Sequence, residues 1–345
     1  MNGVIKLKIS LFSTKSISVF LLVSISMLKP VWAHHGGEGI TGVGLAGPII
    51  TVPAYTLPKG LKFINLLTDY TNFNSFSNKK LIELDKRHEH IHDTANLLTP
   101  SIGTGYGLTD NLTIGIRLPY VFRFGIKDVH DANVSKAGNA IGVGDITLFG
   151  QYRFLKNEKH NLNAALLTGL KIPSGIRRTK GRDGDLFETD EQPGSGSWDP
   201  FLGLAISKKL GQFSLDANGL YKFATRGSQG SDLGDVVNYN LAASYRLIKD
   251  GDFYENDVNA KMQKKISFDV ILEANGIWSQ KPKTFYGFVD ENHGGTLVNL
   301  SPGCRLTYNR KWIWSLSTGL PIIDDLNGRQ RRPNIRLLSV VTRVF

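Results

Sequence analysis

Hydrophobic and polar residues alternate along most of the chain. In "NLTIGIRLPY" the apolar Leu112, Ile114 and Ile116 share one face, and Thr113 and Arg117 share the other. The stretches "FSLDANGLYKF" and "ISFDVILEANGIW" repeat this pattern. Side chains of a β-strand point alternately to opposite faces, so each stretch is predicted to be a strand with one apolar and one polar face.

The predicted strands are long. We identify twelve, at residues 61–72, 98–107, 111–121, 143–155, 161–172, 198–209, 212–224, 235–248, 265–278, 295–308, 311–321 and 335–345. Most have about 10–13 residues, whereas strands of globular domains commonly have about 5–6. A tilted strand needs about 9–11 residues to cross a bilayer. A soluble β-sandwich would show the same alternation, but it would not need strands of this length.

The connections between these strands alternate between short and long. The turns "LTDN", "KNEKHN", "LGQ" and "NRK" are short, and the long polar connections are 74–97, 122–142, 173–197, 225–234, 279–294 and 322–334. One connection on the short side, "KDGDFYENDVNAKMQKK", is longer than expected. Short turns at one rim and long loops at the other are typical of outer-membrane barrels. We therefore predict an all-β fold, a transmembrane antiparallel β-barrel of about twelve strands with long extracellular loops and short periplasmic turns, in the bacterial outer membrane.

The last segment, "IRLLSVVTRVF", is strand-like up to Phe345. In a closed barrel the last strand pairs with the first, so that no backbone group is left unpaired in the bilayer. A terminal Phe is also the ending that the outer-membrane insertion machinery recognises. This machinery is therefore a predicted partner through Phe345, beside outer-membrane lipid and lipopolysaccharide. Arg343 shares a face with Phe345, and its long side chain is expected to reach the periplasmic interface.

The amino-terminal residues have the pattern of a secretory signal. Three lysines precede the apolar run "ISVFLLVSISML", and "KPVWA" follows it. A spanning helix needs about 20 apolar residues, and this run is shorter. We therefore predict a cleaved signal peptide at 1–33, a periplasmic or lumen-entering arm at 34–60, and the barrel at 61–345.

Composition adds two constraints. Cys304 is the only cysteine, so no intramolecular disulfide can form, and stability has to come from one large fold. The formal net charge is +11, but four lysines of that excess belong to the predicted signal. The remaining positive charge fits anionic partners and ordinary solubility equally well.

Three stretches also resemble a known family. The sequences "GVGDITLFGQYRF", "GSGSWDPFLGLAISK" and "LGDVVNYNLAASYRL" are similar to the outer-membrane "transporter" family labelled "Putative MetA-pathway of phenol degradation". The resemblance extends from about Gly42 to Phe345. It implies a barrel and the passage of small, in part aromatic, compounds. The three stretches are structural rather than catalytic motifs.

One motif in the first long connection could bind a metal. "HEHIH" matches H-E-x-x-H, in which a helix would place two histidines on one face to bind zinc, with Glu89 as a base. As a strand, His88, His90 and His92 would share one side and could chelate a metal without catalysis. No third ligand follows at the spacing of a metalloprotease, and a solvated loop is the third interpretation.

Other motifs give no site. "GVGLAG" matches G-x-G-x-x-G but has no strand before it and no helix after it, so nucleotide binding is not predicted. The acidic stretch "GRDGDLFETDE" departs from the EF-hand spacing for calcium. "RQRR", residues 329–332, could bind lipopolysaccharide phosphates from its surface loop, where nucleic acid is not an expected partner.

The polar face of the strands is the remaining candidate site. By alternation the lumen carries charges of both signs, and the candidates for selectivity are Arg117, Asp145, Arg153, Lys171, Asp216, Lys222, Arg246, Asp269, Glu273 and Arg305. They would form either a plug of ion pairs or the lining of a selective path. Apolar residues predicted to face inward are Phe63, Leu67, Phe149, Ile271 and Ile277. We predict a passive channel for small solutes, aromatic and other small hydrophobic compounds among them, with no catalytic residues and no cofactor. The alternatives are a barrel with an extracellular metal site, or a structural or adhesive barrel without transport.

Overall fold

The strands that the alternation predicts close into a ring. The computed structural model describes residues 48–86, 94–130, 133–249 and 266–345, all within one unit, Trp32–Phe345. In these ranges one antiparallel sheet contains β1 (Lys62–Phe73), β2 (Asn96–Thr109), β3 (Leu112–His130), β4 (Asn133–Val143), β5 (Ile146–Asn157), β6 (Leu162–Ile172), β7 (Asp199–Leu210), β8 (Phe213–Lys222), β9 (Val236–Lys249), β10 (Ile266–Ser279), β11 (Gly295–Tyr308), β12 (Trp312–Leu326) and β13 (Pro333–Val344).

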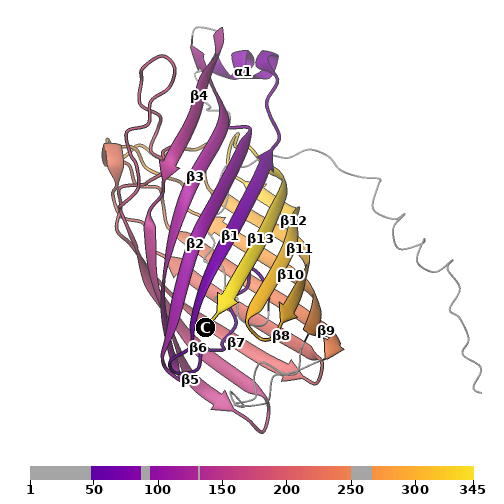
Figure 1. Cartoon of the computed structure of the whole chain (residues 1–345). Coiled ribbons are helices and arrows are strands. Elements are labelled where there is room, and N and C mark those ends of the chain that lie inside the picture. The colour runs from indigo at the N-terminus through magenta and orange to yellow at the C-terminus, as the bar shows by residue number, and fades with distance from the viewer. Residues whose placement is uncertain (1–47, 87–93, 131–132, 250–265) are drawn as a thin grey trace, which may run out of the picture. The chain divides into compact units, whose positions relative to one another are not determined.

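Two pairings, β1 with β13 and β2 with β3, close the sheet into a ring. β1 pairs with β13 on one side and with β2 on the other, and β2 pairs with β3. β5 pairs with the periplasmic part of β3, Leu112–Arg117, and β4 pairs with the extracellular part, Tyr120–His130. β4 and β5 therefore share one position in the ring. The described chain is a closed barrel of twelve positions, as the sequence predicts (Figure 1).

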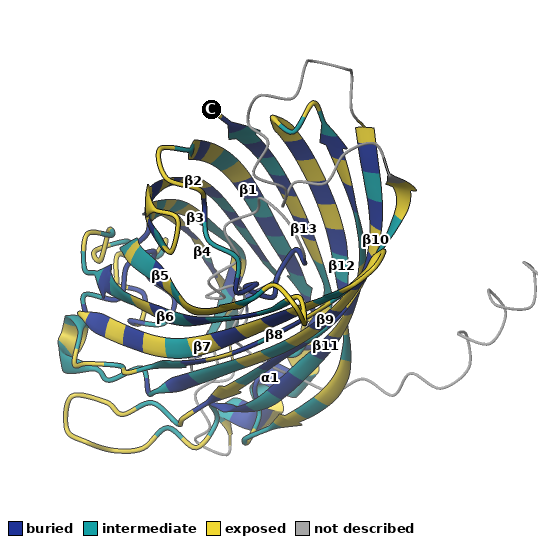
Figure 2. Cartoon of the chain, turned by 90° about the horizontal axis from the view of Figure 1, so that it is seen from below, coloured by how far each residue is buried: buried dark blue, intermediate teal, exposed yellow. Residues whose placement is uncertain are grey.

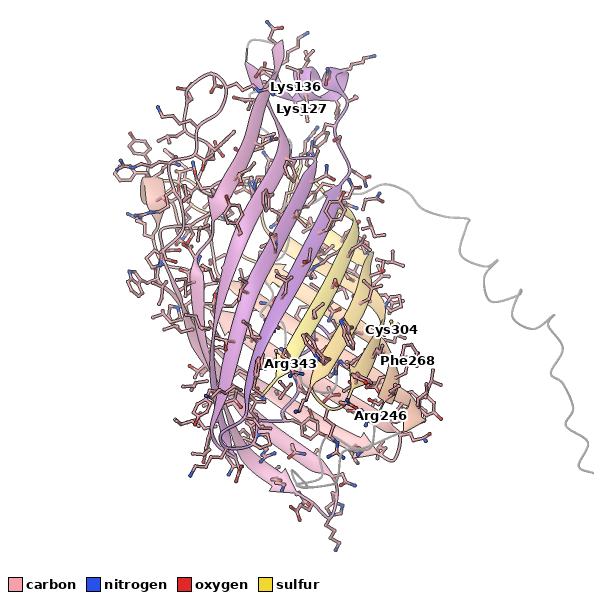
Figure 3. All side chains as sticks on the ribbon, viewed as in Figure 1. Lys127, Lys136, Arg246, Phe268, Cys304 and Arg343 are labelled. Atoms are coloured by element: carbon pink, nitrogen blue, oxygen red, sulfur yellow. The ribbon has the colours of Figure 1, made fainter. Side chains whose placement is uncertain are left out.

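The extracellular half of β3 is the main difference from the prediction. We expected residues 122–142 to form a loop, but β3 continues to His130, and β4 returns beside it. The pairing slips on both sides of Ile126, next to Gly125, which has a φ of 68°. Bulges of this kind shift side chains between faces, so alternation could not reveal the hairpin. Lys127 and Lys136 lie near the top of this hairpin (Figure 3).

The first long loop also contains a short helix, α1 (Asn78–Asp85). Ser77 caps its first turn by accepting a hydrogen bond from the Lys80 N–H at 3.2 Å. Leu81 and Leu84 are buried in a cluster with Val129 of β3. In the described ranges, no helix is long and apolar enough to cross a membrane.

The two faces of the sheet differ as the alternation predicts. On the outer face, Leu204 and Leu241 are 58% and 63% exposed, and such apolar residues recur around the barrel. Near its periplasmic rim, Trp312 and Trp314 stack at 6.0 Å, and the Arg343 guanidinium lies 4.8 Å from the Trp312 ring. On the inner face, polar and apolar residues are buried together. Figure 2 shows buried and exposed positions alternating along the strands. The side chains available to a solute are therefore those that line the inside of the ring.

The basic motif at residues 329–332 has a structural role that the sequence did not indicate. Arg331 is fully buried and donates a hydrogen bond to the Thr94 carbonyl of the first loop. Arg332 forms an ion pair with Asp324. Because Arg331 is fully buried, the expectation that it binds lipopolysaccharide phosphates is wrong for this residue, and for the rest of the motif it stays a prediction.

Candidate functional site

The inside of the barrel contains the segment Pro48–Pro58, which leads into β1 (Figure 2). We call it the lumen segment. Residues 48–54 are all buried, although none belongs to the sheet. An unpaired backbone inside a barrel needs hydrogen-bond partners, because each buried polar group left without one destabilises the structure by about 1–3 kcal/mol. The inner wall provides these partners.

The wall contacts follow the lumen segment from strand to strand. The Leu57 N–H donates to the Thr113 hydroxyl of β3 at 2.8 Å, and Gln151 of β5 donates to the carbonyls of Pro53 and Tyr55. The Ala54 N–H donates to the Ser207 hydroxyl of β7 at 2.8 Å. The remaining contacts are the Val52 N–H to Asn218 of β8, three N–H groups to Glu273 of β10, and Arg305 of β11 to the Pro48 carbonyl. The segment is thus bound to six strands.

Glu273 makes the most contacts with the lumen segment. Its carboxylate accepts from the N–H groups of Ile49, Ile50 and Thr51 at 3.0–3.1 Å. The side chain is almost fully buried, at 1% exposure. Successive backbone N–H groups form a concave site for an anion, and here the anion is a side chain of the barrel wall. A buried charge is tolerated because these donors replace its hydration.

Apolar contacts occupy the space between the polar ones. Ile49 and Ile50 pack in a cluster with Leu67, Ile271 and Leu338. A second cluster joins Val52 and Ala54 of the lumen segment to Leu167, Phe201 and Leu220 of the wall. Leu57 packs with Phe63 and Ile313 near the periplasmic end. The wall beneath the lumen segment therefore has three apolar patches between its polar contacts, and the segment packs against each of them.

Two pairs of the predicted selectivity residues contact each other directly. Arg246 and Asp269 form a two-point contact at 2.8 and 3.3 Å near the periplasmic end of the barrel, where Figure 3 labels Arg246. Lys171 lies 3.5 Å from Asp145 and 2.6 Å from Asp199. Each of these positive charges therefore has a carboxylate beside it.

The other predicted residues bond to neutral groups of the wall or to the lumen segment. Asp216 accepts from the hydroxyls of Ser207 and Ser214 at 2.5 and 2.7 Å. The Arg117 guanidinium donates to Ser101. Arg153 donates to Asp110 and Asn111 at the periplasmic turn, and Lys222 lies at the extracellular end of β8. Glu273 and Arg305 contact the lumen segment instead of facing each other across an open path.

Several contributing residues were not among the predicted candidates. Arg336 of β13 forms a two-point contact with Asp69 of β1 at 2.9 and 2.6 Å across the closing seam. Ser195 bonds Asp145 at 2.6 Å and thereby fixes the loop 173–198 to the inner wall. The positive charge of Arg336 and its alternation onto the inner face could have revealed its contact with Asp69. No periodic signal marks Ser195, because it lies in an irregular loop.

Two extracellular loops, 173–198 and 280–294, meet at His293. Its imidazole contacts Asp290 at 2.5 Å and Asp190, from the loop 173–198, at 3.6 Å. Burial alone would lower the pKa of His293, but the hydrogen bonds to Asp190 and Asp290 outweigh it and raise the pKa to about 10. A charged histidine between two carboxylates therefore joins two loops at neutral pH.

The predicted metal motif, His88, His90 and His92, lies outside the described residues, and so does the segment 34–47 of the predicted arm. Within the described ranges, no group of three or more His, Cys, Asp or Glu side chains is arranged to hold a metal ion. The metal hypothesis stays a prediction, as do the boundaries of the signal and the arm.

Comparisons with known proteins agree with this architecture. A family model described as "Putative MetA-pathway of phenol degradation" matches residues 90–320. No curated protein matches the chain. The fold is similar to that of the COG4313 outer membrane channel from Pseudomonas putida F1, with 18% identity, a TM-score of 0.55, and coverage of 85% of this chain and 98% of that one. These results confirm the predicted outer-membrane barrel.

Two further solved barrels are more distant. The CymD monoaromatic hydrocarbon channel is 8% identical, with a TM-score of 0.39 and coverage of 84% of this chain and 88% of that one. The toluene transporter TbuX of Ralstonia pickettii is 10% identical, with a TM-score of 0.38 and coverage of 84% and 90%.

Proposed function

Because the chain belongs to the family described as "Putative MetA-pathway of phenol degradation", we propose that its barrel is a passive outer-membrane channel for small, uncharged solutes with a large apolar surface, aromatic solutes included. One observation carries this proposal: the inner wall has apolar patches against which the lumen segment packs. Phe201 and Leu167 lie in a cluster with Val52 and Ala54 of the segment, and Leu338 lies in a cluster with Ile49 and Ile50. When the segment is displaced, the wall presents an apolar surface to the lumen.

The charged residues support an uncharged solute. A narrow pore selects ions through charges that face its path. Here Lys171 and Arg246 have carboxylates within hydrogen-bond distance, and Glu273 is occupied by backbone N–H groups. Paired charges attract ions less than isolated ones, so these residues favour a structural role over ion selection.

Passage requires the lumen segment to move, and a reversible crosslink tests this requirement. The Ala54 N–H lies 2.8 Å from the Ser207 hydroxyl, so the two positions are neighbours. We would introduce Ala54→Cys and Ser207→Cys in a Cys304→Ser background, which leaves one cysteine pair. Uptake of radiolabelled toluene, benzoate and glucose would be measured in cells that lack the native protein and express each variant.

The expected result is that oxidation abolishes toluene uptake in the double-cysteine variant and that a reducing agent restores it. Either single-cysteine variant should be insensitive to oxidation. Benzoate and glucose uptake should stay at the level of cells without the protein. Equal toluene uptake in the oxidised and reduced states would contradict movement of the segment. Equal uptake with and without the wild-type protein would contradict the channel function itself.

A further inference from the structure

Four asparagines form a row across the inner wall. The strand register places Asn218 of β8 opposite Asn240 of β9, Asn240 opposite Asn275 of β10, and Asn275 opposite Asn299 of β11. Directly opposite side chains on one face of an antiparallel sheet lie about 4.5–5.5 Å apart at Cβ. The four amides therefore lie at one level of the barrel, beside the lumen segment.

The lumen segment fixes the direction of the amides in this row. The Val52 N–H donates to Asn218 at 2.8 Å, so the amide oxygen of Asn218 must face it. Asn240 donates its Nδ2 to that same oxygen at 3.2 Å, which turns the Asn240 oxygen toward β10. Asn275 then donates its Nδ2 to the Asn240 oxygen at 3.1 Å. Each amide has one oxygen and one NH₂ group, so the orientation passes from one residue to the next.

The chain of hydrogen bonds along the row stops between its last two members, Asn275 and Asn299. The amide oxygens of Asn275 and Asn299 are both buried, and neither accepts a hydrogen bond from any residue in the described ranges. The side chains themselves are 5% and 7% exposed. A buried acceptor without a donor destabilises a structure by about the energy of a lost hydrogen bond. The interruption is thus a place where a bound group with a suitable hydrogen would be stabilised.

We propose that Asn275 and Asn299 form a binding site for the hydroxyl group of an uncharged solute. This proposal rests on the channel function proposed above and specifies its solute class. A hydroxyl donates one hydrogen and accepts through its oxygen, so it donates to the Asn275 oxygen and accepts from the Asn299 amide. The body of the solute lies against Leu297, the buried apolar residue that comes next to Asn299 on the inner face of β11.

The surroundings disfavour the two charged alternatives. An ammonium group would donate to both oxygens, but it has no lone pair to accept a hydrogen bond from the Asn299 amide N–H. A carboxylate or phosphate brings only acceptors, which the two amide oxygens repel. A hydroxyl on an apolar body is the group that matches both the polar and the apolar part of the site.

Two probes of matched size test the assignment. 4-Fluorophenol carries a hydroxyl where 4-fluorotoluene carries a methyl group, and ¹⁹F NMR titration measures the binding of each to the folded barrel. Asn275→Leu and Asn299→Leu remove the amides at similar side-chain volume. Asn238→Leu is the matched control, because Asn238 lies on the same inner face of β9 but outside the row. Heat-dependent gel mobility would show that each variant is folded.

We expect the wild type and Asn238→Leu to bind 4-fluorophenol about tenfold more tightly than either row variant does, which corresponds to about 1.4 kcal/mol. Binding of 4-fluorotoluene should be equal in all four proteins. Equal binding of both probes by the wild type and the row variants would overturn the assignment and mean that water alone satisfies the two amides. That result would leave the channel function standing, because toluene uptake tests it separately.

Discussion

Glu273 holds the lumen segment through three backbone N–H groups, which makes it the residue on which the closed state depends most. The sequence placed Glu273 on the inner face by its parity, and this placement is correct. Its bonds to Ile49, Ile50 and Thr51 could not be predicted, because they join positions more than 220 residues apart. Strand periodicity contains no information on how an irregular segment meets a wall.

The change Glu273→Gln should release the lumen segment. Glutamine keeps one acceptor oxygen and adds an NH₂ group, which faces the N–H groups without a bond. A charge-assisted hydrogen bond contributes about 1.5–3 kcal/mol, so we expect the open fraction to rise about 30-fold. Single-channel recording in planar bilayers measures the open fraction. Asp269→Asn, which alters a carboxylate paired with Arg246 and away from the segment, should leave it unchanged. An unchanged open fraction in Glu273→Gln would show that other contacts hold the segment.

At the level of elements, the seam between β1 and β13 depends on both backbone pairing and one buried ion pair. Arg336 binds Asp69 at two points, and Asp69 is 3% exposed. Removing one partner of a buried pair destabilises a protein by about 3–5 kcal/mol, because the other charge stays buried. We expect Arg336→Met to lower the free energy of unfolding by that amount, as measured by urea titration. The double change Arg336→Met with Asp69→Leu should recover much of the loss, and no recovery would mean that the pair itself is not the cause.

The contact between the two loops that meet at His293 should weaken at high pH. The pKa of His293 in the folded state, about 10, is above its value in an unfolded chain, about 6.5. The contact with Asp190 and Asp290 is therefore fully stabilising below about pH 6.5 and is lost as the pH rises through about 10. Limited proteolysis of the loops at pH 7 and pH 10.5 measures this. The loops of the wild type should be cleaved faster at pH 10.5 than at pH 7. In His293→Ala the loops should be cleaved at the same rate at the two pH values.

The elements themselves could be predicted to different extents. Strands that cross the membrane follow strict alternation, because one face meets lipid and the other meets the lumen. β4 could not be predicted, because the hairpin that it forms with β3 is covered by α1 and by Phe187 of the loop 173–198, and its faces no longer differ in polarity. The ion pair of Lys171 with Asp199 depends on the register between β6 and β7, which places the two residues directly opposite each other. Alternation predicts that Lys171 faces inward, but it does not predict which residue lies opposite.

For the whole molecule, closure of the ring predicts resistance to detergent. In the described ranges every strand except β4, which pairs with β3 alone, has two neighbours, so the ring itself offers no edge at which unfolding could begin. We expect the protein to migrate faster on a gel when it is not boiled than when it is boiled. A variant truncated after Arg332, which lacks β13, should migrate at one position under both conditions. Recovery of the intact protein as a soluble periplasmic species would contradict the barrel.

The lumen segment also has a consequence for assembly. It lies inside a ring that the first and last strands of the sheet close, so it has to be in place before closure or be drawn in afterwards. Its contacts run from β3 through β5, β7, β8 and β10 to β11, one after another. A growing sheet can therefore fold around the segment strand by strand, while export delivers the rest of the chain. A barrel that closed first would have to draw the segment in through one end and would make these contacts only afterwards.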